Sequence, residues 1–183
     1  MTTSEEVLSI YARSGAALYF GEPVTVSEHC LQAAHFAQAA GAPEALVIAA
    51  LLHDVGHLIE TVPDDIGDWN TDAQHEVSGS RWLAARFGPA ISEPVRLHVP
   101  AKRYLCATDP GYFGKLSSAS VITLRLQGGP MSSGERAAFE AEPYHREAVL
   151  VRQWDDQGKI AGLRTADFSH YRTLIDRLQR TPQ

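Results

Sequence analysis

The sequence lacks several features that mark well-known classes of protein. It has only two cysteines, Cys30 and Cys106, which are too few for a disulfide framework. It has no run of 18 apolar residues, so we expect no membrane-spanning helix. The first 15 residues lack both the positive charge and the long apolar stretch of a secretory signal. We therefore expect a cytoplasmic protein with reduced thiols.

An excess of positive charge is also missing. The 16 lysines and arginines face 22 aspartates and glutamates, which gives a net charge of −6 and no basic run. Proteins that bind nucleic acid by neutralising phosphates need the opposite balance, so we expect no nucleic-acid partner. A length of 183 residues with 44% hydrophobic residues suits one domain over 1–183, with a core at about 3–160 and a tail at 161–183.

Hydrophobic residues recur at helical spacing, and no alternating pattern is long enough to predict a sheet. The expected architecture is an all-α bundle of six to eight helices. The helical segments that we predict are approximately 3–18, 26–40, 44–58, 72–87, 92–99, 118–127, 144–159, one opening at Ser132 and a short one from Ser169. The polar stretch 60–72 is expected to be a loop. The N-cap of the second helix is expected at Thr25 or Ser27.

Histidines and acids form a candidate metal site. His53 and Asp54 are adjacent in a predicted helix that is apolar all round and must be buried. Such a pair is costly to bury unless it is ligated or hydrogen-bonded. Neighbouring predicted helices carry further ligand types: His29, His75, His98 and Asp155. Four imidazoles and two carboxylates suit two metal ions that share one carboxylate. Nitrogen and carboxylate ligands without a thiolate favour iron, manganese or zinc over copper(I). His35, His145 and His170 are expected to be ordinary histidines.

These residues resemble the signature of the HD-domain superfamily, including the extra histidines of its dinuclear branch. Most members are phosphohydrolases, and some are oxygenases with a mixed-valent di-iron centre. The organophosphonate oxygenases among them are similar to most of the chain, from about Tyr11 to Lys159. The matching stretches are Tyr19–Glu22, Glu28–Gln32, Ala49–His57, His98–Leu105, Gln127–Met131 and Arg152–Asp156.

The resemblance implies a role for each ligand. One iron would be bound by His29, His53, Asp54 and Asp155, and a second by His75 and His98 with Asp54 bridging. The substrate would be 1-hydroxy-2-(trimethylammonio)ethylphosphonate or 1-hydroxy-2-aminoethylphosphonate. Cleavage of its C–P bond with O2 would give phosphate with glycine betaine or glycine. An upstream 2-oxoglutarate-dependent hydroxylase would supply the substrate.

The resemblance also implies substrate contacts. Hydrogen-bond donors to the phosphonate would be Lys102, Arg152, His57, Ser120 and Thr123. Tyr19 would bind iron until substrate displaces it, and Glu22 would face the substrate's ammonium group.

Each of these residues also has an ordinary interpretation. Lys102 could be solvated at a helix end, and Arg152 could pair with Asp156 or Glu147. His57 could support a ligand carboxylate. The hydroxyl residues could simply begin a helix, and Tyr19 and Glu22 could form a plain turn.

Two other functions remain open. A metal-dependent phosphohydrolase of a nucleotide or phosphomonoester would use the same ligands to form a hydroxide nucleophile. A non-catalytic binding module of HD type would be expected to have lost ligands. The presence of Tyr19, His57 and Lys102 favours the oxygenase over the phosphohydrolase. The presence of all six expected ligands favours it over the binding module.

Overall fold

The computed structural model describes residues 1–59 and 74–180, and these confirm the all-α fold class. The predicted loop at 60–72 lies outside the described residues. The described part has ten α-helices, more than the six to eight predicted, and two short 3-10 helices. Its only β contact is an antiparallel bridge between Leu18 and Thr25. No helix in these two ranges combines the length and the apolar character needed to cross a membrane.

The α-helices of the described residues lie in this order along the chain. They are α1 (Thr3–Ser14), α2 (Val26–Ala39), α3 (Glu44–Leu52), α4 (Gly56–Ile59), α5 (His75–Ala84), α6 (Pro89–Thr108), α7 (Ser118–Leu126), α8 (Ser133–Glu140), α9 (His145–Gln157) and α10 (Arg172–Leu178). The 3-10 helices are η1 (Phe113–Lys115) and η2 (Phe168–Tyr171).

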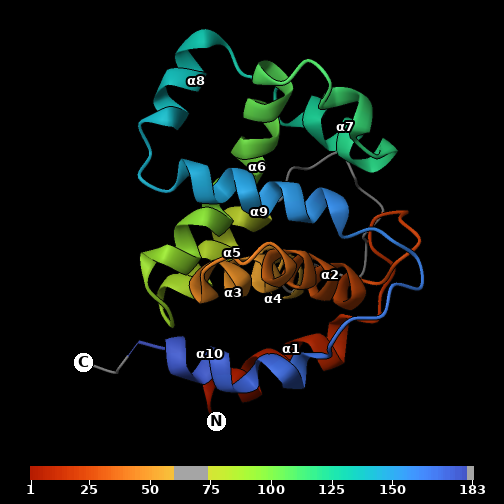
Figure 1. Ribbon diagram of the computed structural model, residues 1–183, viewed down its shortest axis with the longest axis vertical. Helices are drawn as coiled ribbons and strands as arrows, with labels where there is room; N and C mark the ends of the chain where they lie inside the picture. Colours follow the sequence, from red (N-terminus) through yellow and green to blue (C-terminus); the bar gives the residue numbers. More distant parts are fainter. Residues whose placement is uncertain (60–73, 181–183) are drawn as a thin grey trace.

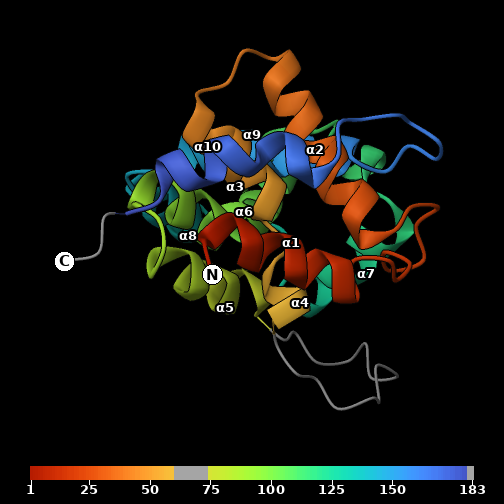
Figure 2. The same ribbon diagram turned by 90° about the horizontal axis from the view of Figure 1, so that it is seen from below.

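The helices are arranged in tiers around α9, which crosses the middle of the molecule (Figure 1). Helices α7 and α8 lie on one side of α9, and α2 to α5 lie on the other. Helices α1 and α10 pack side by side at the base, as the view from below also shows (Figure 2). The long helix α6 runs from α5 up to the tier of α7 and α8, and it packs against both α5 and α9.

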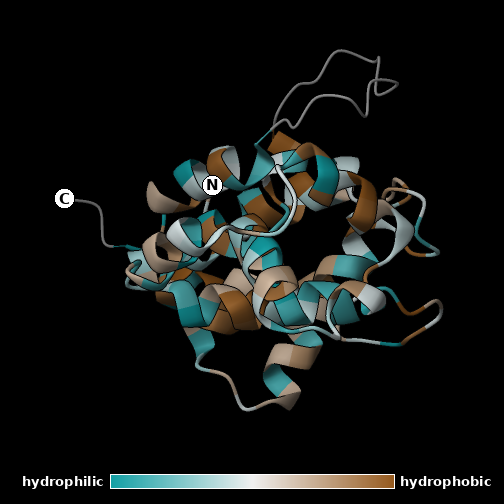
Figure 3. Cartoon of the chain, turned by 90° about the horizontal axis from the view of Figure 1, so that it is seen from above, coloured by the Kyte–Doolittle hydropathy of each residue, from teal (hydrophilic) through white to brown (hydrophobic). Residues whose placement is uncertain are grey.

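The core is centred on α3, as its sequence predicts. Every residue from Leu46 to Leu52 is buried, because α3 packs against α2, α6 and α9. The helices carry both hydrophobic and hydrophilic residues (Figure 3), as expected of helices with one buried face. The site residues that follow α3 therefore enter the centre of the molecule.

Local signals for helix starts are confirmed at two positions. Thr25 caps α2 through a capping box with Glu28, and Ser132 caps α8 through a capping box with Glu135. These side chains satisfy main-chain N–H groups that have no partner inside the helix. The cap at Thr25 places His29 in the first turn of α2.

Three predicted helix boundaries are wrong. The first helix ends at Ser14 rather than at residue 18. The third ends at Leu52, because Val55 and His57 donate to the carbonyl three residues before each of them, which tightens the chain into a turn. Helix α6 extends to Thr108 through two internal prolines, whereas the sequence predicted a helix over 92–99. Its burial against α5 and α9 outweighs the hydrogen bonds that the prolines remove.

Candidate metal centre

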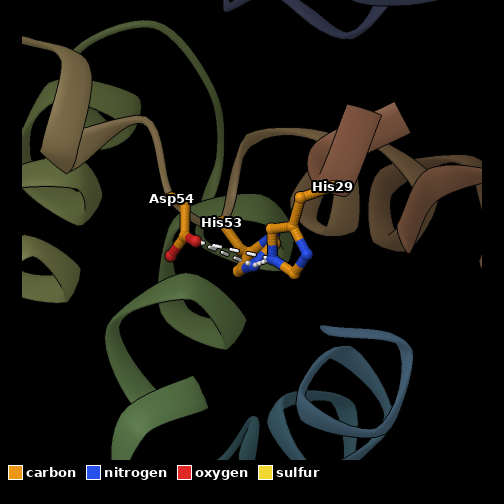
Figure 4. A group of neighbouring side chains, drawn as sticks. All are labelled: His29, His53 and Asp54. Atoms are coloured by element: carbon orange, nitrogen blue, oxygen red, sulfur yellow. Dashed lines mark hydrogen bonds and ion pairs between the residues drawn. The ribbon is translucent and has the colours of Figure 1, made fainter. Parts of the chain in front are cut away.

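The six predicted metal ligands converge from five segments of the chain. They are His29 in α2, His53 and Asp54 in the turn after α3, His75 at the start of α5, His98 in α6 and Asp155 in α9. Five of them are buried, and the side chain of His75 is 12% exposed. Figure 4 shows His29, His53 and Asp54 turned toward one another. The prediction that each histidine lies within a helix is wrong for His53, which lies in a turn.

The first group of ligands surrounds one carboxylate oxygen of Asp54. Its Oδ2 lies 3.6 Å from His29 Nε2 and 3.4 Å from His53 Nε2. The two Nε2 atoms are 3.1 Å apart. Asp155 Oδ1 joins them, at 3.4 Å from His29 Nε2 and 4.0 Å from His53 Nε2. These four side chains can therefore direct two nitrogens and two oxygens at one ion.

The second group uses the other oxygen of Asp54. Its Oδ1 lies 3.3 Å from His75 Nε2 and 3.6 Å from His98 Nε2. The two Nε2 atoms are 3.3 Å apart. Asp54 therefore faces both groups, one oxygen to each, which is the arrangement of a bridging carboxylate.

The tautomers of three histidines fit a bound cation. The Nδ1 atoms of His29, His53 and His98 donate to the carbonyls of Gly158, Ala50 and Val95 at 2.9, 2.8 and 2.7 Å. A carbonyl only accepts hydrogen bonds, so Nδ1 carries the hydrogen and Nε2 of the neutral ring presents a lone pair. In addition, the buried Asp54 Oδ2 and Asp155 Oδ1 have no hydrogen-bond partner. Lone pairs that face one another in a buried site fit metal ions between them.

The electrostatics support the same donor set. Burial lowers the pKa of His53 and His98, so both rings are neutral. Burial would raise the pKa of Asp54, but the surrounding histidines outweigh it and hold that pKa well below the usual range. Burial likewise opposes ionisation of Asp155, but Arg152 and Lys159 lower its pKa. Burial opposes the charged form of His75, but the hydrogen bond and charge of Asp54 outweigh it and raise its pKa. The site therefore combines buried carboxylates with neutral rings at His53 and His98, and a metal ion would take the place of the proton at His75.

Two glycines let the turn after α3 approach α5. A Cβ atom on Gly56 would stand 2.0 Å from the carbonyl oxygen of His75, and one on Gly79 would stand 3.1 Å from the Gly56 nitrogen. This close packing stacks the rings of His57 and His75, with centroids 3.8 Å apart. His57 is therefore beside the second ligand group. Burial and the neighbouring His75 lower its pKa to about 3.

The turn between α1 and α2 brings Tyr19 to the first ligand group. Its ring stacks on His29, with centroids 3.9 Å apart and planes 14° apart. Phe20 follows with a φ of 42°, an uncommon value outside glycine, and its ring lies 4.7 Å from that of His57. Glu22 lies in the same turn, and its buried Oε1 has no hydrogen-bond partner. The positive φ of Phe20 is energetically costly, and strained residues of this kind cluster at functional sites.

Cations and hydroxyls meet beside the ligand groups. Lys102 is 2% exposed and donates to Thr123 Oγ1 at 2.7 Å. The interpretation of Lys102 as a solvated helix end is therefore wrong. Ser120 lies one turn before Thr123 on α7, and its Oγ accepts from Arg152 at 3.3 Å. The predicted donors Lys102, Arg152, Ser120 and Thr123 are thus brought together.

Arg152 is held by two carboxylates. Its Nη1 donates to Asp155 Oδ2 at 2.7 Å, and its Nη2 donates to Asp156. The pairing with Asp156 is the alternative expected from the sequence. Its Nε also donates to the hydroxyl of Tyr112 at 3.1 Å, and this hydroxyl in turn donates to Asp156. Sequence reasoning missed Tyr112, which lies 40 residues from Arg152 in a stretch without a motif.

One histidine expected to be ordinary lies apart from the site, and one lysine that the sequence did not predict lies within it. His145 packs near Phe139 and bonds to the carbonyl of Glu142, apart from the ligand groups, as expected of an ordinary histidine. This lysine is Lys159, two residues beyond α9, whose Nζ lies 3.3 Å from Ser120 Oγ. The only signal in the sequence was its position four residues after Asp155.

Comparison with known proteins adds three findings. The family model described as HD domain matches residues 26–156. The [1-hydroxy-2-(trimethylamino)ethyl]phosphonate dioxygenase (glycine-betaine-forming) of Leisingera caerulea is 43% identical over 95% of this chain and 89% of its own length. The hydroxymethylphosphonate dioxygenase of Gimesia maris is 43% identical over 96% of this chain and 89% of its own length.

Proposed function

The chain belongs to the HD-domain family, among its phosphonate dioxygenases, and on that premise we propose that it cleaves the C–P bond of a 1-hydroxyphosphonate with O2. The hydroxyphosphonate would be converted to a carboxylate and phosphate. For R–CH(OH)–PO3²⁻ and O2, the products R–COO⁻, HPO4²⁻ and one proton balance atoms and charge. A trimethylammoniomethyl group as R gives glycine betaine, and an aminomethyl group gives glycine.

The observation that carries the proposal is the sharing of Asp54 between two histidine pairs, beside a cluster of cations and hydroxyls. Donors of nitrogen and carboxylate type without thiolate suit iron. We propose a mixed-valent pair of iron ions, held by His29, His53, Asp54, Asp155, His75 and His98. Bound iron would supply the electron exchange that allows O2 to react with a carbon centre.

The protein's own groups would bind and orient the substrate. The phosphonate oxygens would accept from Lys102 and Arg152 and from the hydroxyls of Ser120 and Thr123, because charged donors bind such oxyanions most strongly. His57 would face the substrate from the second ligand group. Tyr19 would cover the first ligand group until substrate displaces it, which limits oxygen activation in the absence of substrate.

We propose that the preferred substrate carries a cationic amine, as a trimethylammonio or ammonio group. The support is Glu22, whose buried Oε1 has no hydrogen-bond partner. Glu22 lies three residues after Tyr19, in the turn beside the first ligand group. The aromatic rings of Tyr19 and Phe20, 5.0 Å apart, offer faces that attract a trimethylammonium group. The reaction that supplies this substrate must hydroxylate a phosphonate at C1, which suits a 2-oxoglutarate-dependent hydroxylase.

The test measures O2 uptake and phosphate release together. Iron-loaded protein receives 1-hydroxy-2-(trimethylammonio)ethylphosphonate, its primary-amine analogue or hydroxymethylphosphonate, with and without O2. We expect equal amounts of O2 consumed and phosphate released, and none released anaerobically. Phosphate release at the same rate without O2 would instead support a phosphohydrolase.

A further inference from the structure

Lys159 lies at the cluster of cations and hydroxyls without an assigned role. The chain has three lysines, and two of them, Lys102 and Lys159, are at this cluster. The Nζ of Lys159 donates to Ser120 Oγ at 3.3 Å and lies 6.0 Å from the centre of the Tyr19 ring. Its side chain is 12% exposed, so it faces the site rather than bulk solvent.

The carboxylates near Lys159 are engaged elsewhere. Asp155 Oδ1 and Asp156 Oδ1 lie 3.8 and 4.0 Å from its Nζ, beyond hydrogen-bond distance. Asp156 is paired with Arg152, and Asp155 Oδ1 is the atom that faces the first histidine pair. Arg152 therefore has two close carboxylate partners, whereas Lys159 has none within hydrogen-bond distance.

The main chain on both sides of Lys159 is fixed to α2. The carbonyl of Gly158 accepts from His29 Nδ1 at 2.9 Å. The buried side chain of Gln32 donates to the Ile160 carbonyl at 2.8 Å and accepts from its N–H at 2.9 Å. The helix that carries a metal ligand thus holds Lys159 in position.

We propose that Lys159 is a phosphonate-binding residue, and that with Lys102 it supplies the positive charge that neutralises the phosphonate dianion. The two lysines approach the hydroxyls of α7 separately, Lys102 at Thr123 and Lys159 at Ser120. An oxyanion between these hydroxyls would accept from both ammonium groups. Gln32 is the positioning residue of Lys159. This assignment rests on the proposed function, because that function supplies the oxyanion.

The test measures binding of inorganic phosphate to the metal-loaded enzyme by anaerobic titration calorimetry. Removing one charged hydrogen bond should weaken phosphate binding about tenfold or more in Lys159→Met. Lys159→Arg should keep most of the affinity. Lys115→Met removes an exposed lysine from η1 and should bind phosphate as wild type does. Lys159→Gln is measured alongside, so that the result does not depend on the folding of one variant.

Steady-state kinetics separate binding from structure. Lys159→Met should raise KM for the hydroxyphosphonate with a smaller effect on kcat, and Gln32→Ala should change KM in the same direction. Wild-type affinity for phosphate in both Lys159→Met and Lys159→Gln would overturn the assignment, and so would a loss confined to kcat. A wild-type enzyme that binds phosphate through Lys159 but consumes no O2 with any hydroxyphosphonate would overturn the proposed function alone.

Discussion

The Nε2 atoms of His29 and His53 lie 3.1 Å apart although both rings carry their hydrogen on Nδ1. Neither atom can donate to the other, so two lone pairs face each other in a buried site beside the carboxylate of Asp54. This arrangement would be unfavourable without a cation, and a bound cation would relieve it. Metal binding and folding stability are coupled for this reason.

We expect two metal ions per chain and a lower melting temperature after chelation. A ligand that binds only the folded state at about 100 times its Kd stabilises the fold by about 2.7 kcal/mol. His53→Ala should lose metal from the first group and leave Asp54 with fewer partners. Metal analysis with thermal unfolding checks both effects. A single tightly held ion, with no second site at saturating metal, would contradict the shared-carboxylate arrangement.

Gly158→Ala should weaken metal binding although Gly158 is no ligand. A Cβ atom there would stand 3.0 Å from the carbonyl oxygen of His29 and 3.2 Å from its Nδ1. The main chain or ring of His29 must shift by a few tenths of an ångström to admit the methyl group. We expect this shift to weaken the hydrogen bond of Nδ1 and to turn Nε2 away from the metal position. We expect roughly a 10- to 100-fold loss of metal affinity. Gly134→Ala in α8 meets open space and should leave affinity unchanged. Equal metal affinity in the two variants would show that this bond does not orient His29.

The candidate ligands were predictable from the sequence, and the resemblance also gave their division into two groups that share Asp54. The course of the main chain that brings them together was not predictable. A histidine–aspartate pair in an apolar segment is improbable unless it has partners, and further histidines followed at similar intervals. The sequence could not show that the chain turns at His53, because that turn depends on close packing between Gly56 and α5. Lys159 and Tyr112 were missed because their roles arise from contacts with Ser120 and Arg152, 39 and 40 residues away.

The pH dependence of kcat/KM should reflect Lys102. Burial, together with the positive charge of Arg152, lowers the pKa of Lys102 to about 7. Below this pH the side chain is an ammonium ion that binds the phosphonate, and above it the charge is lost, so kcat/KM should fall as pH rises through about 7. Lys102→Arg keeps its charge throughout and should abolish this fall. An identical profile in the Lys102→Arg variant would assign the titration to another group.

Tyr19 should give the oxidised, iron-loaded protein a visible colour. Burial, followed by the charges of Asp54 and Asp155, raises the pKa of its phenol well above the usual value, so only a bound metal would remove the proton. Iron(III)–phenolate coordination absorbs visible light, and substrate should bleach or shift the band. Tyr19→Phe should lose the band but keep its iron. Tyr171→Phe, at a buried tyrosine bonded to Gln38, should keep both. An unchanged spectrum in Tyr19→Phe would exclude the phenolate.

Glu22→Gln should separate cationic from uncharged substrates. The change keeps the size of the side chain and removes its charge, so it should weaken binding of 1-hydroxy-2-(trimethylammonio)ethylphosphonate while sparing hydroxymethylphosphonate. Loss of one charged contact costs about 1.5–3 kcal/mol, or about ten- to a hundredfold in affinity. The measurement is the ratio of the two KM values in each protein.

A nearby carboxylate supplies the control for Glu22. Glu28→Gln alters an exposed carboxylate that caps α2, and glutamine preserves that cap, so its KM ratio should match wild type. If Glu22→Gln weakened the binding of both substrates equally, Glu22 would only stabilise the turn that carries Tyr19. Weaker binding of the cationic substrate alone would identify the side chain of Glu22 as the group that recognises the amine.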